Sequence, residues 1–561
     1  SRATAFGSRG IFHPPHWRMM RGLPPLLRLQ LLAGACRAAA SAPAPGPASE
    51  AETCGAQGGG SACSGRPGSI TERYHWPTAH GHWRHYGNSP HAGPFNLSAS
   101  LAWSWHHPFG EYHEMPLGAT IDDQRNIYVA GDQAVWKLSP DGATVWRWSP
   151  PLEPGQRRSN LIPDGASLYE GAVIVDTTHG MMYSVDMRTG IQNWASQVSE
   201  NICMDTGHVA VYGGVAIAEI DGPDPGGLCS GLVGVNATDG SRIWTYKADN
   251  PLWDLMVQFL DDDTFVFQDI NGKAYRNHLF NGTNLWRNGG EPVESWTDGT
   301  QGLGPNGIMY TVSILANTPG CYPGVRALTA GPDCRGKLTA FRVSDGEQLW
   351  QREVPRPPNS SPVVGRLGSG DRLSVVIPIG QQPSCDPVVG FLWAWYPSIM
   401  FRLPKSVQDT IGWLALQLTV RMSDAWHQRV WKNLDLPTDV YAFDAETGQF
   451  QWSWKGPTYK RYQCPGDEKG FLTRSALGIR TASCPTPWSA PRIGADGTIY
   501  VGNQNGFFYA IKDLDGNGQI DPNTEVSSFD CEAEFSSIGS AHAPGLVVIA
   551  SGVKVWAFKA P

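Results

Sequence analysis

One short phrase returns along this chain and limits its fold more than any other feature. In the fullest copy, VYAFDAETGQFQWSW at 440–454, a glycine stands four residues before a tryptophan. Asp, Asn or Thr precedes the glycine in each of the six copies, whose pairs are Gly142/Trp146, Gly190/Trp194, Gly240/Trp244, Gly282/Trp286, Gly346/Trp350 and Gly448/Trp452. Asp and Asn bond the backbone of their own turn, and glycine adopts a positive φ, so each copy is predicted to be a β-hairpin.

Each hairpin is predicted to be half of a larger unit. The segment SAPRIGADGTIYVGNQNGFFYAIKD at 489–513 contains three apolar runs separated by Asp-Gly and Asn-Gly turns, and the segment from Gly118 has the same layout. Four short antiparallel strands in a repeat of about 40 to 50 residues are typical of a β-propeller blade. The repeated tryptophan is then expected to pack between neighbouring blades. A solenoid of stacked hairpins is the competing architecture.

The number of blades follows from the ends of the chain. The last segment, SAHAPGLVVIASGVKVWAFKAP, supplies only three apolar runs, whereas LSASLAWSW at 97–105 offers an unpaired strand. If that strand completes the last blade, the ring closes and no sheet edge stays open. We therefore expect an all-β, eight-bladed β-propeller of four-stranded antiparallel blades, with seven blades as the alternative.

Composition agrees with many turns and short strands. The chain has 65 Gly, 44 Pro and 23 Trp, and only 17% of its residues are charged. Its net charge is −8 and it contains no basic run, which argues against a nucleic-acid partner.

The first residues are typical of an export signal. From Met20 a basic start is followed by an apolar Leu/Ala segment and small residues, so cleavage is expected near 40–42. We therefore divide the chain into upstream residues plus signal peptide (1–42), a flexible linker (43–74) and the propeller (75–561). Secretion or a secretory-pathway lumen is the expected location, and an organelle transit peptide is the alternative.

The cysteines and sequons fit an exported protein. Ten cysteines follow the signal segment, and an even number favours disulfides. The candidate pairs are Cys321–Cys334, Cys464–Cys484 and Cys203–Cys229. The candidate glycosylation sites are Asn96, Asn236, Asn281 and Asn359.

The phrase AFDAETGQFQW at 442–452 resembles the tryptophan-docking repeat of the pyrroloquinoline-quinone (PQQ) propeller superfamily, A-x-D-x-x-T-G-x-x-x-W. The resemblance extends through the repeats over about 97–558. It implies either a quinoprotein dehydrogenase, which holds PQQ with calcium or a lanthanide over the central channel, or a non-catalytic propeller that binds proteins. The best-known enzymes carry two adjacent cysteines, which this chain lacks.

On this basis we expect an exported, non-catalytic scaffold that binds an unknown protein partner. A quinoprotein dehydrogenase that oxidises an alcohol or sugar is the alternative, and glycan binding on the Trp-rich rim is a third possibility. We assign no catalytic residue and no PQQ contact.

The turn of the seventh blade has a different sequence, DLDGNGQIDPNTE at 513–525, which resembles a D-x-D-x-N-G calcium loop. Calcium takes six to eight oxygen ligands, which alternate residues of a tight loop can supply. The expected metal ligands are Asp513, Asp515, Asn517, Gln519 and Asp521. Thr524 stands at the closing position, where Glu525 can substitute if the backbone shifts. An elongated acidic turn without metal is the alternative.

The sixth unit contains a long insertion at 385–437. An aromatic run is followed by apolar residues at helical spacing, Ile411, Leu414, Leu418 and Met422. We expect a helical insertion in blade 6 that caps the ring. A partner-binding surface, or contact with a membrane surface through 388–433, are the alternatives.

Overall fold

The computed structural model describes residues 73–559, with gaps. The gaps are residues 84–85, 109–117, 132, 153–161, 163–164, 178–179, 200–207, 222–228, 253–255, 291–296, 298, 316–333, 369–371, 381–402, 405–406, 408–409, 412–436, 459–486, 534, 536–537 and 553. The chain divides into two units, Ser1–Ala62 and Cys63–Pro561, and every described residue belongs to the second. The expected signal peptide, most of the linker and almost all of the 385–437 insertion lie outside the described residues, so the helical cap stays a prediction.

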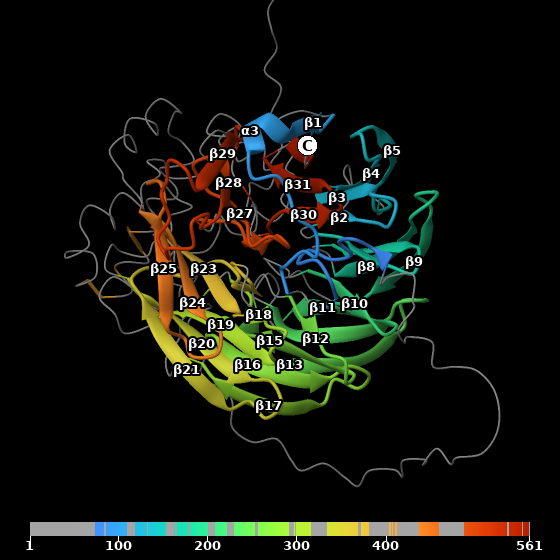
Figure 1. Ribbon diagram of the computed structural model, residues 1–561. Coiled ribbons are helices and arrows are strands. Elements are labelled where there is room, and N and C mark those ends of the chain that lie inside the picture. Colours follow the sequence, from blue (N-terminus) through green and yellow to red (C-terminus); the bar gives the residue numbers. More distant parts are fainter. Residues whose placement is uncertain are drawn as a thin grey trace, which may run out of the picture. The chain divides into compact units, whose positions relative to one another are not determined.

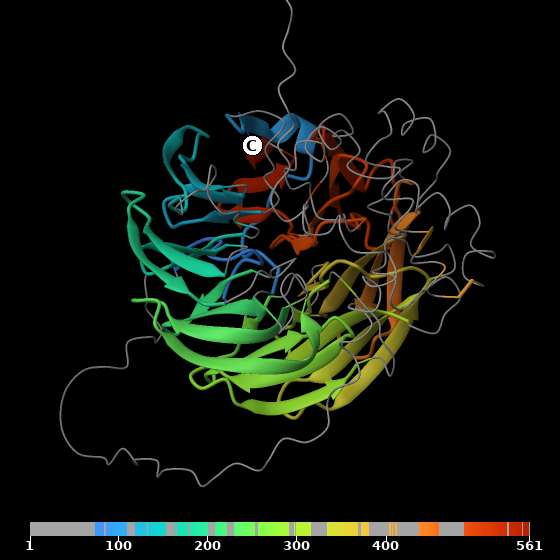
Figure 2. The same ribbon diagram turned by 180° about the vertical axis from the view of Figure 1, so that it is seen from behind.

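The second unit contains eight four-stranded antiparallel sheets arranged as the blades of a β-propeller (Figures 1 and 2). This confirms eight blades and excludes seven. Blades 1 to 4 are formed by β2 (Ala119–Ile121), β3 (Ile127–Gly131), β4 (Ala134–Leu138) and β5 (Thr144–Trp148); β6 (Ser167–Tyr169), β7 (Ala172–Asp176), β8 (Met181–Asp186) and β9 (Gln192–Gln197); β10 (Ala210–Tyr212), β11 (Val215–Asp221), β12 (Cys229–Asn236) and β13 (Arg242–Leu252); and β14 (Gln258–Phe259), β15 (Thr264–Gln268), β16 (Lys273–His278) and β17 (Asn284–Gly289).

Blades 5 to 8 follow the same order. They are formed by β18 (Gly302–Leu303), β19 (Ile308–Ile314), β20 (Gly336–Arg342) and β21 (Gln348–Val354); β22 (Val363–Gly365), β23 (Ser374–Gly380), β24 (Thr438–Asp444) and β25 (Phe450–Lys455); β26 (Arg492–Ile493), β27 (Ile499–Gly502), β28 (Phe507–Ile511) and β29 (Val526–Asp530); and β30 (Ala541–Ala543), β31 (Leu546–Ser551), β32 (Lys554–Lys559) and β1 (Leu101–His106).

The two ends of the propeller meet in blade 8. β1 pairs antiparallel with β32, and Ser104 lies opposite Trp556. This confirms the expected closure, with one correction to its start. The segment Leu97–Ser100 is a short helix, α3, because the side chain of Asn96 accepts a hydrogen bond from the Ala99 N–H (3.1 Å) and caps it.

The core lies between blades rather than within one sheet. The second strand of a blade is buried on both faces, as in β3, whereas the outer strand alternates between exposed and buried positions, as in β9. One buried cluster joins Tyr310 and Leu338 of blade 5 to Val375 and Phe443 of blade 6. Each blade therefore completes its hydrophobic core only by packing on the next.

The repeated tryptophans lie at these seams. Six outer-strand tryptophans each donate an indole hydrogen bond to a backbone carbonyl of the following blade; the pairs are Trp103–Pro140, Trp146–Met187, Trp194–Ala237, Trp244–Leu279, Trp286–Val343 and Trp350–Ala445. The same indoles cover the turn glycines of the following blades, Gly142, Gly190, Gly240, Gly282, Gly346 and Gly448. The first pair involves Trp103, which lies outside the six repeats, and spans the closure of the ring.

No helix among the described residues is both long enough and apolar enough to cross a bilayer.

Candidate functional site

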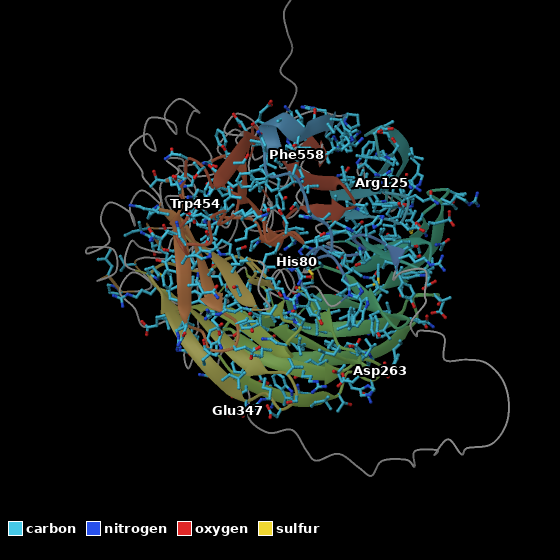
Figure 3. The ribbon with its side chains drawn as sticks, viewed as in Figure 1. His80, Arg125, Asp263, Glu347, Trp454 and Phe558 are labelled. Atoms are coloured by element: carbon cyan, nitrogen blue, oxygen red, sulfur yellow. The ribbon has the colours of Figure 1, made fainter. Side chains whose placement is uncertain are left out.

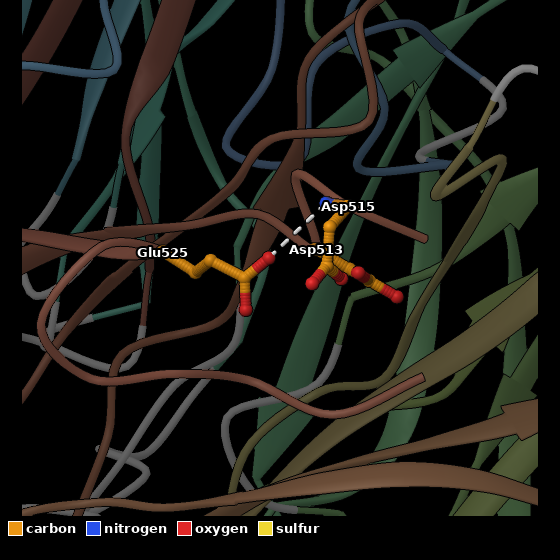
Figure 4. Close-up of side chains that lie close together, drawn as sticks. All are labelled: Asp513, Asp515 and Glu525. Carbon is orange, nitrogen blue, oxygen red and sulfur yellow. Dashed lines mark hydrogen bonds between the residues drawn. The ribbon is translucent and has the colours of Figure 1, made fainter. Parts of the chain in front are cut away.

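The expected calcium turn connects β28 to β29 on the outer part of blade 7. Asp513, Asp515 and Glu525 each direct a carboxylate oxygen into one cluster, and these oxygens lie within 4.8 Å of one another (Figure 4). Oxygens that bind one calcium ion at 2.3–2.6 Å can be about 5 Å apart at most, so the cluster fits a shared ion.

Backbone amides hold the carboxylates in place. The carboxylate of Glu525, which is buried, accepts hydrogen bonds from the N–H groups of Leu514 (2.6 Å), Asp515 (3.3 Å) and Asp521 (2.8 Å). The carboxylate of Asp513 accepts hydrogen bonds from the backbone N–H groups of the two glycines of the loop, Gly516 and Gly518. Asp515 Oδ1 accepts from the Asn517 N–H (3.0 Å), so all three carboxylates are held by backbone amides.

The other expected ligands make hydrogen bonds within the turn. The Oδ1 of Asn517 accepts a hydrogen bond from the Gln519 N–H (2.7 Å). Asp521 accepts from the Asn523 N–H (2.9 Å), and this bond is the main reason that the pKa of Asp521 is lowered. Asp521 does not belong to the acidic cluster. Glu525 therefore joins Asp513 and Asp515, while Asp521 caps a second turn.

The acidic turn also belongs to the seam between blades 6 and 7. Ile520 packs against a buried cluster that includes Trp452, the tryptophan of the sixth repeat. A side-chain Cβ at Gly518 would lie 4.0 Å from the carbonyl oxygen of Gln451. In the seams described above, a tryptophan of one blade covers a turn glycine of the next blade. At the seam between blades 6 and 7 the acidic turn takes that position, so the conformation of the acidic turn affects the stability of the propeller.

A second feature, which the sequence did not reveal, is an N-terminal arm (residues 74–96) along the inner rim of the ring (Figure 1). Its backbone or side chains contact blades 1, 2, 3, 4, 6 and 7 in turn, through Trp76–Ile121, Pro77–Leu168, Trp83–Tyr212, Trp83–Phe259, Asn88–Val364 and Ser89–Ile493. These contacts involve the short innermost strands. The sequence predicted a flexible linker at 43–74 and assigned the residues from 75 onward to the propeller, but it did not predict these contacts.

A tight turn of the arm reaches the centre of the ring. Thr78 and Gly81 exchange backbone hydrogen bonds of 3.1 and 3.0 Å, which place Ala79 and His80 at the tip. Ala79 packs in one buried cluster with Met256 and Ile538, which precede blades 4 and 8. His80 is 3% exposed and lies near the middle of the ring (Figure 3). The tip of the arm therefore lies in the centre of the ring, at the level of the innermost strands.

One buried acid also escaped the sequence analysis. Asp176 ends β7, is 3% exposed, and its Oδ1 has no hydrogen-bond partner among the described residues. Burial raises its pKa to about 7, because the desolvated carboxylate is disfavoured. A polar residue at the end of the apolar run AVIVD was the only signal in the sequence.

The cysteines are only partly described. Cys229 and Cys334 are disulfide-bonded. Their predicted partners, Cys203 and Cys321, lie outside the described residues, as do Cys464 and Cys484, so the three pairings stay predictions. Cys531 is a free, buried thiol.

The four sequons differ in accessibility. Asn96 and Asn281 are exposed, and Asn236 is half-buried. Asn359 is only 1% exposed, which makes it an unfavourable glycan acceptor in the folded protein.

Comparisons with known proteins agree with this architecture. A family model of PQQ-type repeats, described as outer membrane protein assembly factor BamB, matches residues 105–288 and 231–375. The outer membrane protein assembly factor BamB of Nitrosomonas eutropha is 26% identical over 250 residues, which are 42% of this chain and 51% of that protein. The chain thus spans about half the length of this curated relative.

Solved structures with the same fold include enzymes. The quinohemoprotein alcohol dehydrogenase ADHIIG of Pseudomonas putida HK5 aligns with 87% of this chain and 80% of its own, at 11% identity and a TM-score of 0.51. The quinohemoprotein alcohol dehydrogenase of Comamonas testosteroni aligns with 88% and 81%, at 12% identity and the same TM-score of 0.51. At this identity the likeness shows the fold alone.

Proposed function

Because this chain belongs to the PQQ-like β-propeller superfamily, we propose that it acts as an exported, non-catalytic scaffold that binds another protein. The observation that carries the proposal is the filled channel: the arm takes the centre of the ring, where the dehydrogenases of the superfamily are expected to hold their quinone. The relative from Nitrosomonas eutropha, named an assembly factor, supports the same reading.

The described residues at the tip of the arm occupy the position in the centre of the ring that a quinone would need. A cofactor of this size needs a cavity of a few hundred Å³. Here the Ala79 carbonyl accepts a hydrogen bond from Arg492 of β26 (3.0 Å), and the Trp76 ring stacks on His542 of β30 (centroids 5.2 Å). A quinone could enter only if these buried contacts were broken.

The outer rim offers a surface for a protein partner. Large exposed apolar side chains recur on outer strands or just before them, at Leu101, Val145, Ile191, Ile243, Leu285 and Phe450. Ile191 is 67% exposed and Phe450 57%. Because each occupies a similar place in its blade, a partner that spans several blades would meet an apolar contact on each.

Two experiments test the proposal. Photo-crosslinking amino acids placed at Ile191, Leu285 and Phe450 in the native host are expected to capture one protein of defined mass, whereas the same probe at the exposed polar position Glu347 is not. The purified full chain, supplied with PQQ and calcium, is expected to leave a redox dye unreduced with alcohols and sugars. Substrate-dependent dye reduction would overturn the proposal, as would identical crosslinking at all four positions.

We further propose that the acidic turn holds one calcium ion, with Asp513, Asp515 and Glu525 as carboxylate ligands. The ion would neutralise three clustered negative charges at the seam between blades 6 and 7. The cluster itself, within 4.8 Å, supports this. Export, glycosylation at the exposed sequons Asn96 and Asn281, and the disulfide pairs belong to the same proposal.

A further inference from the structure

The channel core contains three buried nitrogen atoms without a hydrogen-bond partner among the described residues. They are Nε1 of Trp76, Nε of Arg492 and Nδ1 of His542. Each of the three residues is 1% exposed. The side chains touch one another: the Trp76 ring stacks on His542 at 5.2 Å, and the guanidinium carbon of Arg492 lies 5.9 Å from the Trp76 ring centroid. Three unpaired nitrogens in one contact group are unusual, because buried polar atoms are nearly always bonded.

Arg492 adds a positive charge with no acidic partner. Its Nη1 donates to the Pro491 carbonyl and its Nη2 to the Ala79 carbonyl, both at 3.0 Å. No ion pair to Arg492 occurs among the described residues, and burial lowers its pKa only to about 9, so it stays charged at neutral pH. Buried charges are normally paired, because desolvation of a lone charge is costly.

The two neighbouring histidines do not supply the missing negative charge. The pKa values of His208 and His542 fall to about 3, mainly because of burial and in addition because of the nearby charge of Arg492. Both rings are therefore neutral at neutral pH. Asp496, an acid whose charge acts on His542, is already paired with Lys512 (2.7 Å).

The chemistry of the three nitrogens selects the ligand. An indole N–H and a guanidinium N–H can only donate hydrogen bonds. In His542, Nε2 lies 2.9 Å from the Ser540 hydroxyl, and when that hydroxyl donates, Nδ1 carries the proton and is a third donor. In this tautomer three donors surround one positive charge, and an acceptor that carries negative charge would satisfy the donors and neutralise the charge together.

We propose that the channel core binds one small monovalent anion, of the size of a halide or formate, between Trp76, Arg492 and His542. The anion neutralises Arg492 and joins the arm, which contributes Trp76, to blades 7 and 8, which contribute Arg492 and His542. The bound anion would thus stabilise the N-terminal arm in its position at the centre of the ring. This site is independent of the protein-binding function proposed above.

Thermal unfolding of the full chain tests the site at pH 7.5 and constant ionic strength. Sodium gluconate, whose anion is too large, is exchanged stepwise for sodium bromide or, in a second arm, sodium formate. We expect a saturable rise in Tm with at least one of the two anions. Saturation with bromide assigns a spherical anion site, and saturation with formate alone assigns a carboxylate site.

Variants and diffraction identify the residues. Trp76→Phe keeps an aromatic ring and removes one donor, so the apparent anion affinity is expected to fall about tenfold. Arg492→Met is expected to abolish the response, and the control Arg287→Met, which removes a half-exposed surface guanidinium, is expected to keep it. If Arg492→Met does not fold, the anion site is tested by Trp76→Phe and by a crystal soaked with the anion. An unchanged affinity in Trp76→Phe would overturn the proposal. So would the absence of anion density beside Arg492 in crystals soaked with the anion that raises Tm, sought as an anomalous peak for bromide or as difference density for formate.

Discussion

The indole of Trp350 in blade 5 lies over Gly448 in the turn of blade 6. Its Nε1 donates a hydrogen bond to the Ala445 carbonyl (3.2 Å), and a Cβ added to Gly448 would stand only 2.6 Å from Cδ2 of the ring. Gly448 also has a φ of +66°. The glycine is required for two reasons: the turn needs a left-handed residue, and the indole of the preceding blade needs the space. Within one repeat the glycine and the tryptophan are only four residues apart in the sequence. In space, however, the tryptophan of one repeat packs on the glycine of the next, so the motif joins consecutive blades.

The substitution Gly448→Ala is expected to lower the free energy of unfolding by about 2–5 kcal/mol. About 1–2 kcal/mol comes from the left-handed backbone, and about 1–3 kcal/mol from the methyl group that displaces Trp350. Urea unfolding followed by tryptophan fluorescence measures the total.

Gly307 provides the matched control. It has a φ of +73°, but a Cβ there would meet nothing within 4 Å. Gly307→Ala should therefore cost only the backbone part, about 1–2 kcal/mol. Equal losses in the two variants would show that the indole contributes no steric constraint.

Trp103 tests the closure of the ring. Its Nε1 donates to the Pro140 carbonyl (3.0 Å), and its ring covers Gly142, so it joins the last blade to the first. Trp103→Ala is expected to lower stability by about 2–4 kcal/mol, because a large, partly buried ring is lost. Hydrogen exchange should accelerate first in β1 and β32. Leu152→Ala, at a 59%-exposed position, is the control and should change neither quantity measurably. Uniform acceleration through all blades would contradict a local weakening of this seam.

The repeats could be predicted because the hydrogen bonds that form their turns join residues close together in the sequence. The turn at 444–448 is set by neighbouring residues: Asp444 accepts from both the N–H and the hydroxyl of Thr447, each at 2.7 Å. Asp186 and Thr189 repeat the same geometry at 2.7 Å. Such bonds depend on spacing in the sequence, so hairpins, blade count and closure could be deduced from it.

The arm and the channel core could not be predicted, because their partners are distant in sequence. Trp76 meets Ile121 and His542, and Arg492 meets Ala79 across more than four hundred positions. No periodic pattern marks these contacts. In the acidic turn, the spacing predicted Asp513 and Asp515, and the structure places both in one cluster with Glu525; Asp521 lies outside this cluster because the path of the backbone decides which carboxylates meet.

The acidic turn makes a prediction about calcium. A chelator is expected to lower the Tm of the full chain, because an ion that binds only the folded state at about 100 times its Kd stabilises it by about 2.7 kcal/mol. Asp515→Ala should abolish the chelator effect, since it removes one carboxylate of the cluster. Differential scanning fluorimetry with and without calcium measures both.

Asp521→Ala separates the two possible ligand sets. Asp521 lies in the same turn but outside the cluster, so this variant should keep the response to calcium even if its overall stability falls. Loss of the response in Asp521→Ala, or equal melting of the parent chain with and without chelator, would contradict the proposed site.

Asp176 predicts a dependence of stability on pH. Its pKa is raised from an ordinary 3.8 to about 7 in the folded protein by burial. Between these values the folded state holds a proton that the unfolded state has lost, so the contribution of Asp176 to stability falls as the pH rises from about 4 to about 7. Asp176→Asn keeps the shape and never ionises, so it is expected to be more stable than the parent chain at pH 8 by about 1–3 kcal/mol.

The gain in the free energy of unfolding should shrink towards pH 4. Urea unfolding at both pH values measures the difference, and Asp141→Asn, at an 86%-exposed carboxylate, is the control that should show no such trend. A constant difference between Asp176→Asn and the parent chain across the range would mean that Asp176 ionises as readily inside the propeller as in water.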